Sequence, residues 1–155
     1  MRTDAPDIYA AGDVTRFEDP VIGERAQNGS WGSAKEQGSL AARTMLADQG
    51  RDVETEEFRW VSSYSITHFD FPFLSFGYPT EGDDDAERKY DETTWRRLAF
   101  KDGQLIGGVL IGDLSAQSKY KDLILSGADV ADQKEILLQE TFDTEDLDLD
   151  VELGE

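Results

Sequence analysis

The chain has 155 residues, with 34 acidic and 15 basic side chains and a formal net charge of −19. A field of this sign repels phosphates and argues against nucleic acids and anionic membranes as partners. Cysteine is absent, which excludes disulfides, cysteine-ligated metal sites and a redox-active cysteine in this chain. The length suits one ordinary domain, or one domain and a piece of another.

The N-terminal residues are polar, and no stretch approaches the roughly 18 apolar residues that a bilayer-spanning helix needs. The sequence therefore predicts a soluble cytoplasmic protein. The acidic composition also suits a high-salt cytoplasm, because salt screens the repulsion between like charges. A halophilic source is a hypothesis that follows from this charge.

The first predicted element is a short strand from Ile8 to Gly12, apolar on both faces, followed by a loop up to Pro20. The strand stops at Gly12 and Asp13. That places a carboxylate at the carboxyl end of a strand, where open α/β sheets bind their ligands. Gly12 lets the backbone approach a ligand closely.

A helix is predicted from Trp31 to Asp48, with Ser30 as its N-cap and Gly50 as its stop. Its N-terminal amides and positive dipole end would point toward Asp13. Gln37 is expected to pack or to bond to backbone. Small and apolar residues share one face of the helix: Ala34, Gly38, Ala41, Ala42, Met45 and Leu46.

A charged linker over residues 51–57 leads to a second predicted unit of strands followed by helices. Strands are predicted over residues 58–66 and 73–78, followed by an acidic loop over residues 81–87. Asp102 and Gly103 separate two apolar runs, residues 93–100 and 104–111, and predict a hairpin.

Two helices are predicted to follow, one over residues 115–126 and a short one after Asp129 that carries residues 136–138. The predicted fold class is α+β: a strand-loop-helix piece of a ligand-binding α/β domain, then an antiparallel sheet and two helices. The predicted domains are residues 1–52, 53–139 and an acidic tail, 140–155. The tail is interpreted either as disordered and solubilising or, from its alternation over residues 146–153, as an added strand.

Two other features are interpreted as structural. His68 is the sole histidine of the chain and has no cysteine or second histidine to share a metal with. Gly107, Gly108 and Gly112 do not fit G-x-G-x-x-G, and they follow or lie within a hairpin strand rather than opening a helix. We therefore predict no metal site and no catalytic residue in this chain.

Two motifs carry a resemblance to a known family. The segments Tyr9-Ala10-Ala11-Gly12-Asp13 and Ala34-Lys35-Glu36-Gln37-Gly38-Ser39-Leu40-Ala41-Ala42 resemble the second flavin-contacting segment of the FAD-dependent pyridine nucleotide-disulfide oxidoreductases. Residues 97–113, 119–124 and 127–130 are similar to the C-terminal domain of the branch that contains rubredoxin, ferredoxin and nitrite reductases. The resemblance implies that residues 1–52 are a piece of an FAD-binding domain. The resemblance covers most of the chain from Thr3 to Leu138.

The resemblance implies a set of cofactor contacts. Gly12 and Asp13 would meet the FAD ribityl chain, and Asp13 would accept hydrogen bonds from its hydroxyls. The helix start would turn its amides toward the flavin ring; its residues are Trp31, Gly32, Ser33 and Ala34. Trp60 would lie near the ring, or belong to an aromatic core or dimer interface. FAD and NAD(P)H are the implied cofactor and co-substrate.

The family also uses two G-x-G-x-x-G units, for FAD and for NAD(P)H, and this sequence contains neither. The chain therefore resembles the C-terminal part of an oxidoreductase that passes electrons from nicotinamide through flavin to an acceptor, and we do not expect it to be active alone. The resemblance suggests a redox protein or another electron acceptor in that role. The alternative hypothesis is a non-catalytic dimerisation or interaction module. A homo-oligomer, most simply a dimer, is expected in either case.

Overall fold

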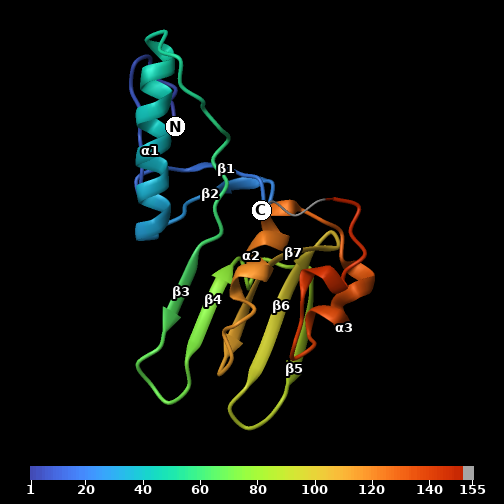
Figure 1. The fold of residues 1–155 in the computed structure, drawn as a ribbon. Coiled ribbons are helices and arrows are strands. Elements are labelled where there is room, and N and C mark those ends of the chain that lie inside the picture. Colours follow the sequence, from blue (N-terminus) through green and yellow to red (C-terminus); the bar gives the residue numbers. More distant parts are fainter. Residues whose placement is uncertain (152–155) are drawn as a thin grey trace. The chain divides into compact units, whose positions relative to one another are not determined.

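The computed structural model describes residues 1–151, which divide into two compact units (Figure 1). The first unit is Met1–Ser62, and the second begins at Ser63. The predicted domain boundary after residue 52 stays a prediction, and residues 53–62 fall in the first compact unit. None of the helices within residues 1–151 combines the length and apolarity needed to cross a membrane.

The first unit contains a small hairpin and one long helix. Strands β1 (Phe17–Asp19) and β2 (Glu24–Ala26) pair antiparallel, in a segment whose first part the sequence predicts as loop. The strand expected over residues 8–12 is reduced to a single bridge between Tyr9 and Arg2. A strand apolar on both faces needs neighbours on both sides, and in the described residues this one has a single bridge, with Ile8 56% exposed.

Helix α1 (Trp31–Asp48) has the predicted bounds because both ends are set by local chemistry. The Ser33 amide donates to the Ser30 hydroxyl at 3.2 Å, which satisfies one free amide of the first turn. At the other end Gly50 has φ of 76°. The amides of Gly50 and Arg51 donate to the carbonyls of Ala47 (2.9 Å) and Leu46 (3.0 Å), the bonding pattern of a Schellman cap.

The buried face of α1 differs from the predicted small-residue face. The structure buries Ser33, Gln37, Leu40, Ala41 and Thr44. By contrast Gly38 and Ala42 are exposed, as are Met45 and Leu46. The side of the helix that packs within the unit is therefore partly polar, and much of the predicted apolar stripe faces solvent.

The second unit is built on a five-stranded antiparallel sheet, which confirms the α+β prediction. Its spatial order is β3-β4-β7-β6-β5. The strands are β3 (Ser63–Ile66), β4 (Phe73–Gly77), β5 (Asp84–Lys89), β6 (Trp95–Lys101) and β7 (Gln104–Ile111). The predicted hairpin at Asp102 and Gly103 is present, with φ values of 51° and 81°, as a two-residue turn of this kind requires.

Two strand predictions need correction. Strand β3 begins at Ser63, so residues 58–62 belong to the first unit and not to the sheet. The acidic loop predicted over residues 81–87 largely forms β5, which pairs with β6 from Asp84 to Lys89. Its charged side chains are mostly exposed, so at the edge of a sheet pairing with a neighbour overrides low strand propensity.

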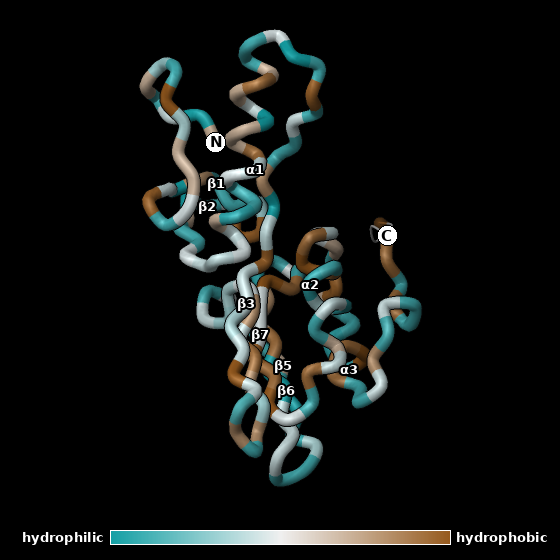
Figure 2. Tube along the Cα trace, turned by 60° about the vertical axis from the view of Figure 1, so that its left-hand side comes forward, coloured by the Kyte–Doolittle hydropathy of each residue, from teal (hydrophilic) through white to brown (hydrophobic). Residues whose placement is uncertain are grey.

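The helices of the second unit pack on one face of this sheet. Helix α2 (Gln117–Ser126) contacts β4 and β7 and ends at Gly127, whose φ is 67°. It is followed by η1 (Ala131–Gln133), α3 (Lys134–Leu137) and η2 (Thr144–Asp146). The hydropathy trace shows apolar stretches in β7 and α2, where the core of the unit lies (Figure 2).

The acidic segment from Glu140 is ordered further than the sequence suggests. Phe142 is 2% exposed and stacks on Tyr120, with ring centroids 5.1 Å apart. Gln133 exchanges two hydrogen bonds with the backbone of Asp148. The alternative strand over residues 146–153 is absent as far as Val151, and its last two residues lie outside the described part.

Candidate functional site

A tight turn presents Asp13 to solvent. Gly12 has φ of 82°, and its carbonyl accepts a hydrogen bond from the Thr15 amide at 3.0 Å. A positive φ is costly for any residue with a β-carbon, so the turn depends on glycine. Asp13 and Val14 occupy the middle of the turn, and both are exposed. The carboxylate of Asp13 is therefore held on a short loop and open to a ligand.

Gln37, fully buried in α1, fastens this turn to the helix. Its Oε1 accepts the Gly12 amide at 2.8 Å and lies 2.7 Å from the Thr15 hydroxyl. Its Nε2 donates to the hydroxyl of Ser33, one turn earlier, at 2.9 Å. The side-chain amide thus bonds to backbone, as expected, and ties the Gly12 turn to the start of α1. Ser33 is itself buried, with its hydroxyl engaged in this network.

The Asp13 carboxylate lies close to the residues that begin α1. A β-carbon built on Gly29 would lie 3.8 Å from the carboxylate carbon and from both of its oxygens. The Gln27 side chain also donates to the Asp13 carbonyl. A β-carbon on Gly12 would lie 3.6 Å from that of Ala34. The turn and the first helical turn are therefore neighbours, and the positive end of the helix favours a negative or electron-rich group there.

The segment after α1 returns to the helix start. Trp60 lies against Gly32 so closely that a β-carbon on Gly32 would be 2.6 Å from its Cζ2 atom. The Ser62 hydroxyl donates to the side chain of Asn28, which is 6% exposed. Buried Nε1 of Trp60 has no hydrogen-bond partner in the described residues. The indole N–H is thus a buried donor without a partner among residues 1–151, beside the start of α1.

Trp31 behaves differently from the rest of the predicted set. It is 84% exposed, and the Lys35 Nζ lies 5.9 Å from the centroid of its ring. The structure thus gathers Gly12, Asp13, Gly32, Ala34 and Trp60 around the start of α1. Ser33 lies beneath them and Trp31 outside. The sequence reasoning missed Thr15, Asn28 and Ser62.

A surface cluster attaches the N-terminal segment, residues 2–9, to the C-terminal end of α1. Asp48, in the last turn of α1, accepts hydrogen bonds from Arg2, at 2.8 Å from its Nε, and from the Tyr9 hydroxyl. These bonds, from Arg2 first and then Tyr9, lower the pKa of Asp48 to about 2. The segment leading into the Gly12 turn is therefore attached to both ends of α1.

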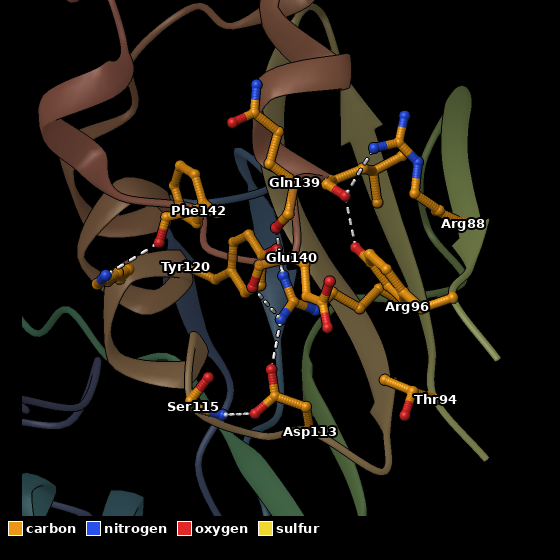
Figure 3. A network of polar contacts seen from close by, with 12 residues as sticks. Arg88, Thr94, Arg96, Asp113, Ser115, Tyr120, Gln139, Glu140 and Phe142 are labelled. Atoms are coloured by element: carbon orange, nitrogen blue, oxygen red, sulfur yellow. Dashed lines mark hydrogen bonds and ion pairs between the residues drawn. The ribbon is translucent and has the colours of Figure 1, made fainter.

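A second polar cluster, in the other unit, is structural. Arg96 on β6 is fully buried and donates to Asp113 at 2.6 Å and to the Gln139 and Glu140 carbonyls at 2.9 and 3.2 Å (Figure 3). Tyr120 donates to the Leu137 carbonyl at 2.6 Å, and burial raises its pKa to about 12. These donors hold the end of α3 and the chain that follows it, so the cluster closes the core instead of facing a ligand.

Within residues 1–151, no group of three or more histidine, cysteine or acidic side chains is placed to hold a metal ion. The site at the start of α1 offers one carboxylate acceptor, helix amides and an indole donor. That set can bind a polyhydroxylated or electron-rich ligand.

Comparisons with known proteins show what the chain resembles. Residues 65–128 match the family model of the Rubredoxin NAD+ reductase C-terminal domain. The chain is similar to Pyridine nucleotide-disulfide oxidoreductase domain-containing protein 1 of Homo sapiens, 29% identical over 152 residues, which cover 94% of this chain and 30% of that protein.

Two solved structures share the fold. NADH:rubredoxin oxidoreductase from Clostridium acetobutylicum is 25% identical with a TM-score of 0.51, over 80% of this chain and 30% of that one. A covalent putidaredoxin reductase–putidaredoxin complex gives a TM-score of 0.69 at 16% identity, over 91% of this chain and 32% of that one.

The chain spans about a third of the length of the curated relatives it matches. The resemblance expected from the sequence is confirmed: the chain is similar to part of the FAD-dependent pyridine nucleotide-disulfide oxidoreductases, and its residues 65–128 correspond to the Rubredoxin NAD+ reductase C-terminal domain.

Proposed function

We propose that this chain provides the flavin-contacting end and the C-terminal domain of an FAD-dependent NAD(P)H oxidoreductase. The observation that carries the proposal is the Gly12–Asp13 turn, fixed by Gln37 beside the start of α1. When bound, FAD would supply a ring that takes hydride from nicotinamide and passes electrons to an acceptor.

The residues present fit such a cofactor. The exposed Asp13 carboxylate can accept hydrogen bonds from ribityl hydroxyls. Gly12 leaves backbone accessible beside Ala34. The first turn of α1 would face the electron-rich part of the ring and favour its reduced, negative form. Trp60 Nε1 offers one more donor at the same place.

This chain is expected to bind flavin weakly and to be inactive alone. Its sequence contains no G-x-G-x-x-G unit for the FAD pyrophosphate or for NAD(P)H. Its role would be to orient the flavin and tune its charge. The acceptor in the complete reaction is proposed to be a redox protein, and the working form a homo-oligomer in the cytoplasm.

A second candidate function is a non-catalytic interaction module. The observation that favours it is the exposed side of α1, where Met45 and Leu46 are 40% and 42% exposed. In this case the first unit would bind another protein surface through that helix and would show no preference for flavin.

A titration with FAD separates the two candidates. We expect saturable binding, detected by induced circular dichroism of the flavin, that Asp13→Ala abolishes and Asp4→Ala leaves intact, since Asp4 is also exposed but lies outside the turn. Equal binding by the two variants would contradict the flavin role. Stoichiometric FAD retained after desalting, with NADH oxidation, would show that the chain acts as an enzyme by itself.

A halophilic setting is a separate proposal from the charge of −19. Added salt screens the repulsion among acidic side chains. The free energy of unfolding should therefore rise with KCl into the molar range, and a flat or falling dependence in urea unfolding would argue against this setting.

A further inference from the structure

The two edges of the five-stranded sheet differ in chemistry. Strand β5, at one edge, consists of Asp84, Asp85, Ala86 and three further charged residues that end at Lys89. Strand β3, at the other edge, is Ser63-Tyr64-Ser65-Ile66 and carries no charge. Natural proteins protect edge strands with charge or proline, because an edge is a template for pairing with another chain. Only β5 has this protection.

The stretch of sequence that contains β3 and β4 is also nearly free of acidic residues. The chain has 34 acidic residues among 155, yet between Glu57 and Glu81 only Asp70 is acidic. A protein with a net charge of −19 repels its own copies. The β3 edge is a surface where that repulsion is low, so two copies can meet there. A strongly charged partner would find no complementary charge on this strand.

Four large aromatic or apolar side chains of β3 and of the loop that leads to β4 are exposed. The exposed fractions are 55% for Tyr64, 48% for Ile66, 72% for Phe69 and 52% for Phe71. Exposed apolar side chains grouped on one hairpin mark an interaction surface more often than scattered ones do.

The register shows which way each residue of β3 points. Ser65 is opposite Leu74, which is 1% exposed in the core, so Ser65 lies on the α2 side of the sheet. Lys121 of α2 donates to Ser63 at 2.8 Å, which agrees with this assignment. Tyr64 and Ile66 alternate with these serines, so they lie together on the face away from α2.

We propose that β3 pairs antiparallel with β3 of a second copy of this chain, across a two-fold axis at Ser65. This register sets Tyr64 opposite Ile66 of the partner, and the two-fold repeats that pair. Aromatic and β-branched residues form favourable cross-strand pairs. A two-fold axis between Tyr64 and Ser65 would instead place an aromatic ring opposite a serine. The sequence therefore favours the axis at Ser65.

The two sheets then join into one continuous sheet, with the helices of both second units on the same side. The prediction concerns residues of the second unit and needs no flavin. It goes beyond the proposed function, and either one can fail while the other stands.

Single-cysteine cross-linking tests the register directly, because the chain has no cysteine. Residues directly opposite in an antiparallel pair have α-carbons about 4.5–5.5 Å apart, which a disulfide can bridge. With oxidised glutathione as the acceptor of two electrons and two protons, Ser65→Cys should give a disulfide-linked dimer. Glu87→Cys, exposed on β5, is the matched control and should stay monomeric. No dimer from Ser65→Cys, or equal dimer from both variants, would overturn the proposal.

Sedimentation equilibrium gives an independent readout. The unmodified chain should be a dimer that tightens from about 0.1 to 1 M NaCl, as screening weakens repulsion. Ile66→Lys should raise the dimer dissociation constant about 100-fold, because two apolar contacts per dimer are lost and two lysines approach each other. Glu87→Gln changes the net charge by the same amount and should have no such effect. A monomer at about 100 µM, or equal effects of both variants, would also overturn the proposal.

Discussion

The two units of this chain are stabilised in different ways. Of the buried apolar side chains in residues 1–151, only four belong to the first unit: Leu40, Ala41, Phe58 and Val61. The second unit buries far more, along the three strands β4, β6 and β7, on α2 and in the chain that follows α2. The first unit relies on polar links, such as those of Gln37 and of Asn28 with Ser62. Because little apolar surface is buried in the first unit, we expect it to have low stability by itself. Its one conformationally fixed turn suits it to binding a ligand.

This comparison predicts unfolding in two steps, with the first unit opening before the second. Four sets of variants test this difference between the units, from the largest expected effect to the smallest.

Arg96→Met should have the largest effect, and on the second unit only. It leaves Asp113 and the carbonyls of Gln139 and Glu140 without their donor, at a cost of about 3 kcal/mol in the free energy of unfolding. Arg97→Met is the control, because Arg97 is on the same strand but its side chain is 42% exposed. Urea unfolding measures both, and equal losses would refute the structural role of Arg96.

Gln37→Leu should destabilise the first unit by about 2 kcal/mol, since it leaves the Gly12 amide without its acceptor. Hydrogen exchange at the Gly12 amide should become faster, while amides of β6 and β7 keep their protection. Gln49→Leu is the control, because Gln49 is exposed just beyond α1. Unchanged exchange at Gly12 would show that Gln37 does not hold the turn.

Two glycines of α1 should respond to alanine with opposite signs. At Gly32 the new β-carbon would lie 2.6 Å from Trp60, so Gly32→Ala should cost about 1–2 kcal/mol and shift tryptophan fluorescence. At Gly38 nothing lies within 4 Å, so Gly38→Ala should stabilise the helix by about 0.5–1 kcal/mol. Thermal unfolding compares them, and the same sign for both would contradict the packing of Trp60 on α1.

The smallest effect is expected from pH. Arg2 and Tyr9 lower the pKa of Asp48 to about 2, from a usual value of 3.8. A lowered carboxyl pKa adds stability that is present above pH 3.8 and is lost as the pH falls toward 2. Over this pH range, the free energy of unfolding of the first unit should therefore fall more steeply in the unmodified chain than in the Asp48→Asn variant. If the unfolding free energy of the two proteins depended on pH in the same way, the contacts of Asp48 with Arg2 and Tyr9 would contribute nothing to stability.

The features that the sequence predicts correctly are those set by interactions between residues close together in the chain. The bounds of α1 follow from Ser30 and Gly50, and the β6–β7 turn follows from Asp102 and Gly103. The Gly12–Asp13 turn and its approach to α1 were recognisable because both halves carry family motifs. The placement of the site residues was thus largely visible before the structure, although their contact with FAD stays a prediction.

The rest depended on contacts between distant residues. The pairing of β5 with β6 places a charged segment in the sheet, against its propensity. Asn28 and Ser62 are 34 residues apart, and no short-range pattern links them. The sequence gives only a weak indication that Arg96 is buried. Period-two alternation sets Arg96 on the same face of its strand as the core residue Leu98. A lone arginine in a strand is, however, more often exposed.

The most direct test of the flavin assignment is to follow the backbone amide NMR signals of the whole chain during addition of FAD. The account predicts that the shifts concentrate at Gly12, Asp13 and the first turn of α1, together with the indole N–H of Trp60. Shifts confined to the second unit, or none at FAD concentrations up to about 5 mM, would contradict the placement of a flavin site at the start of α1.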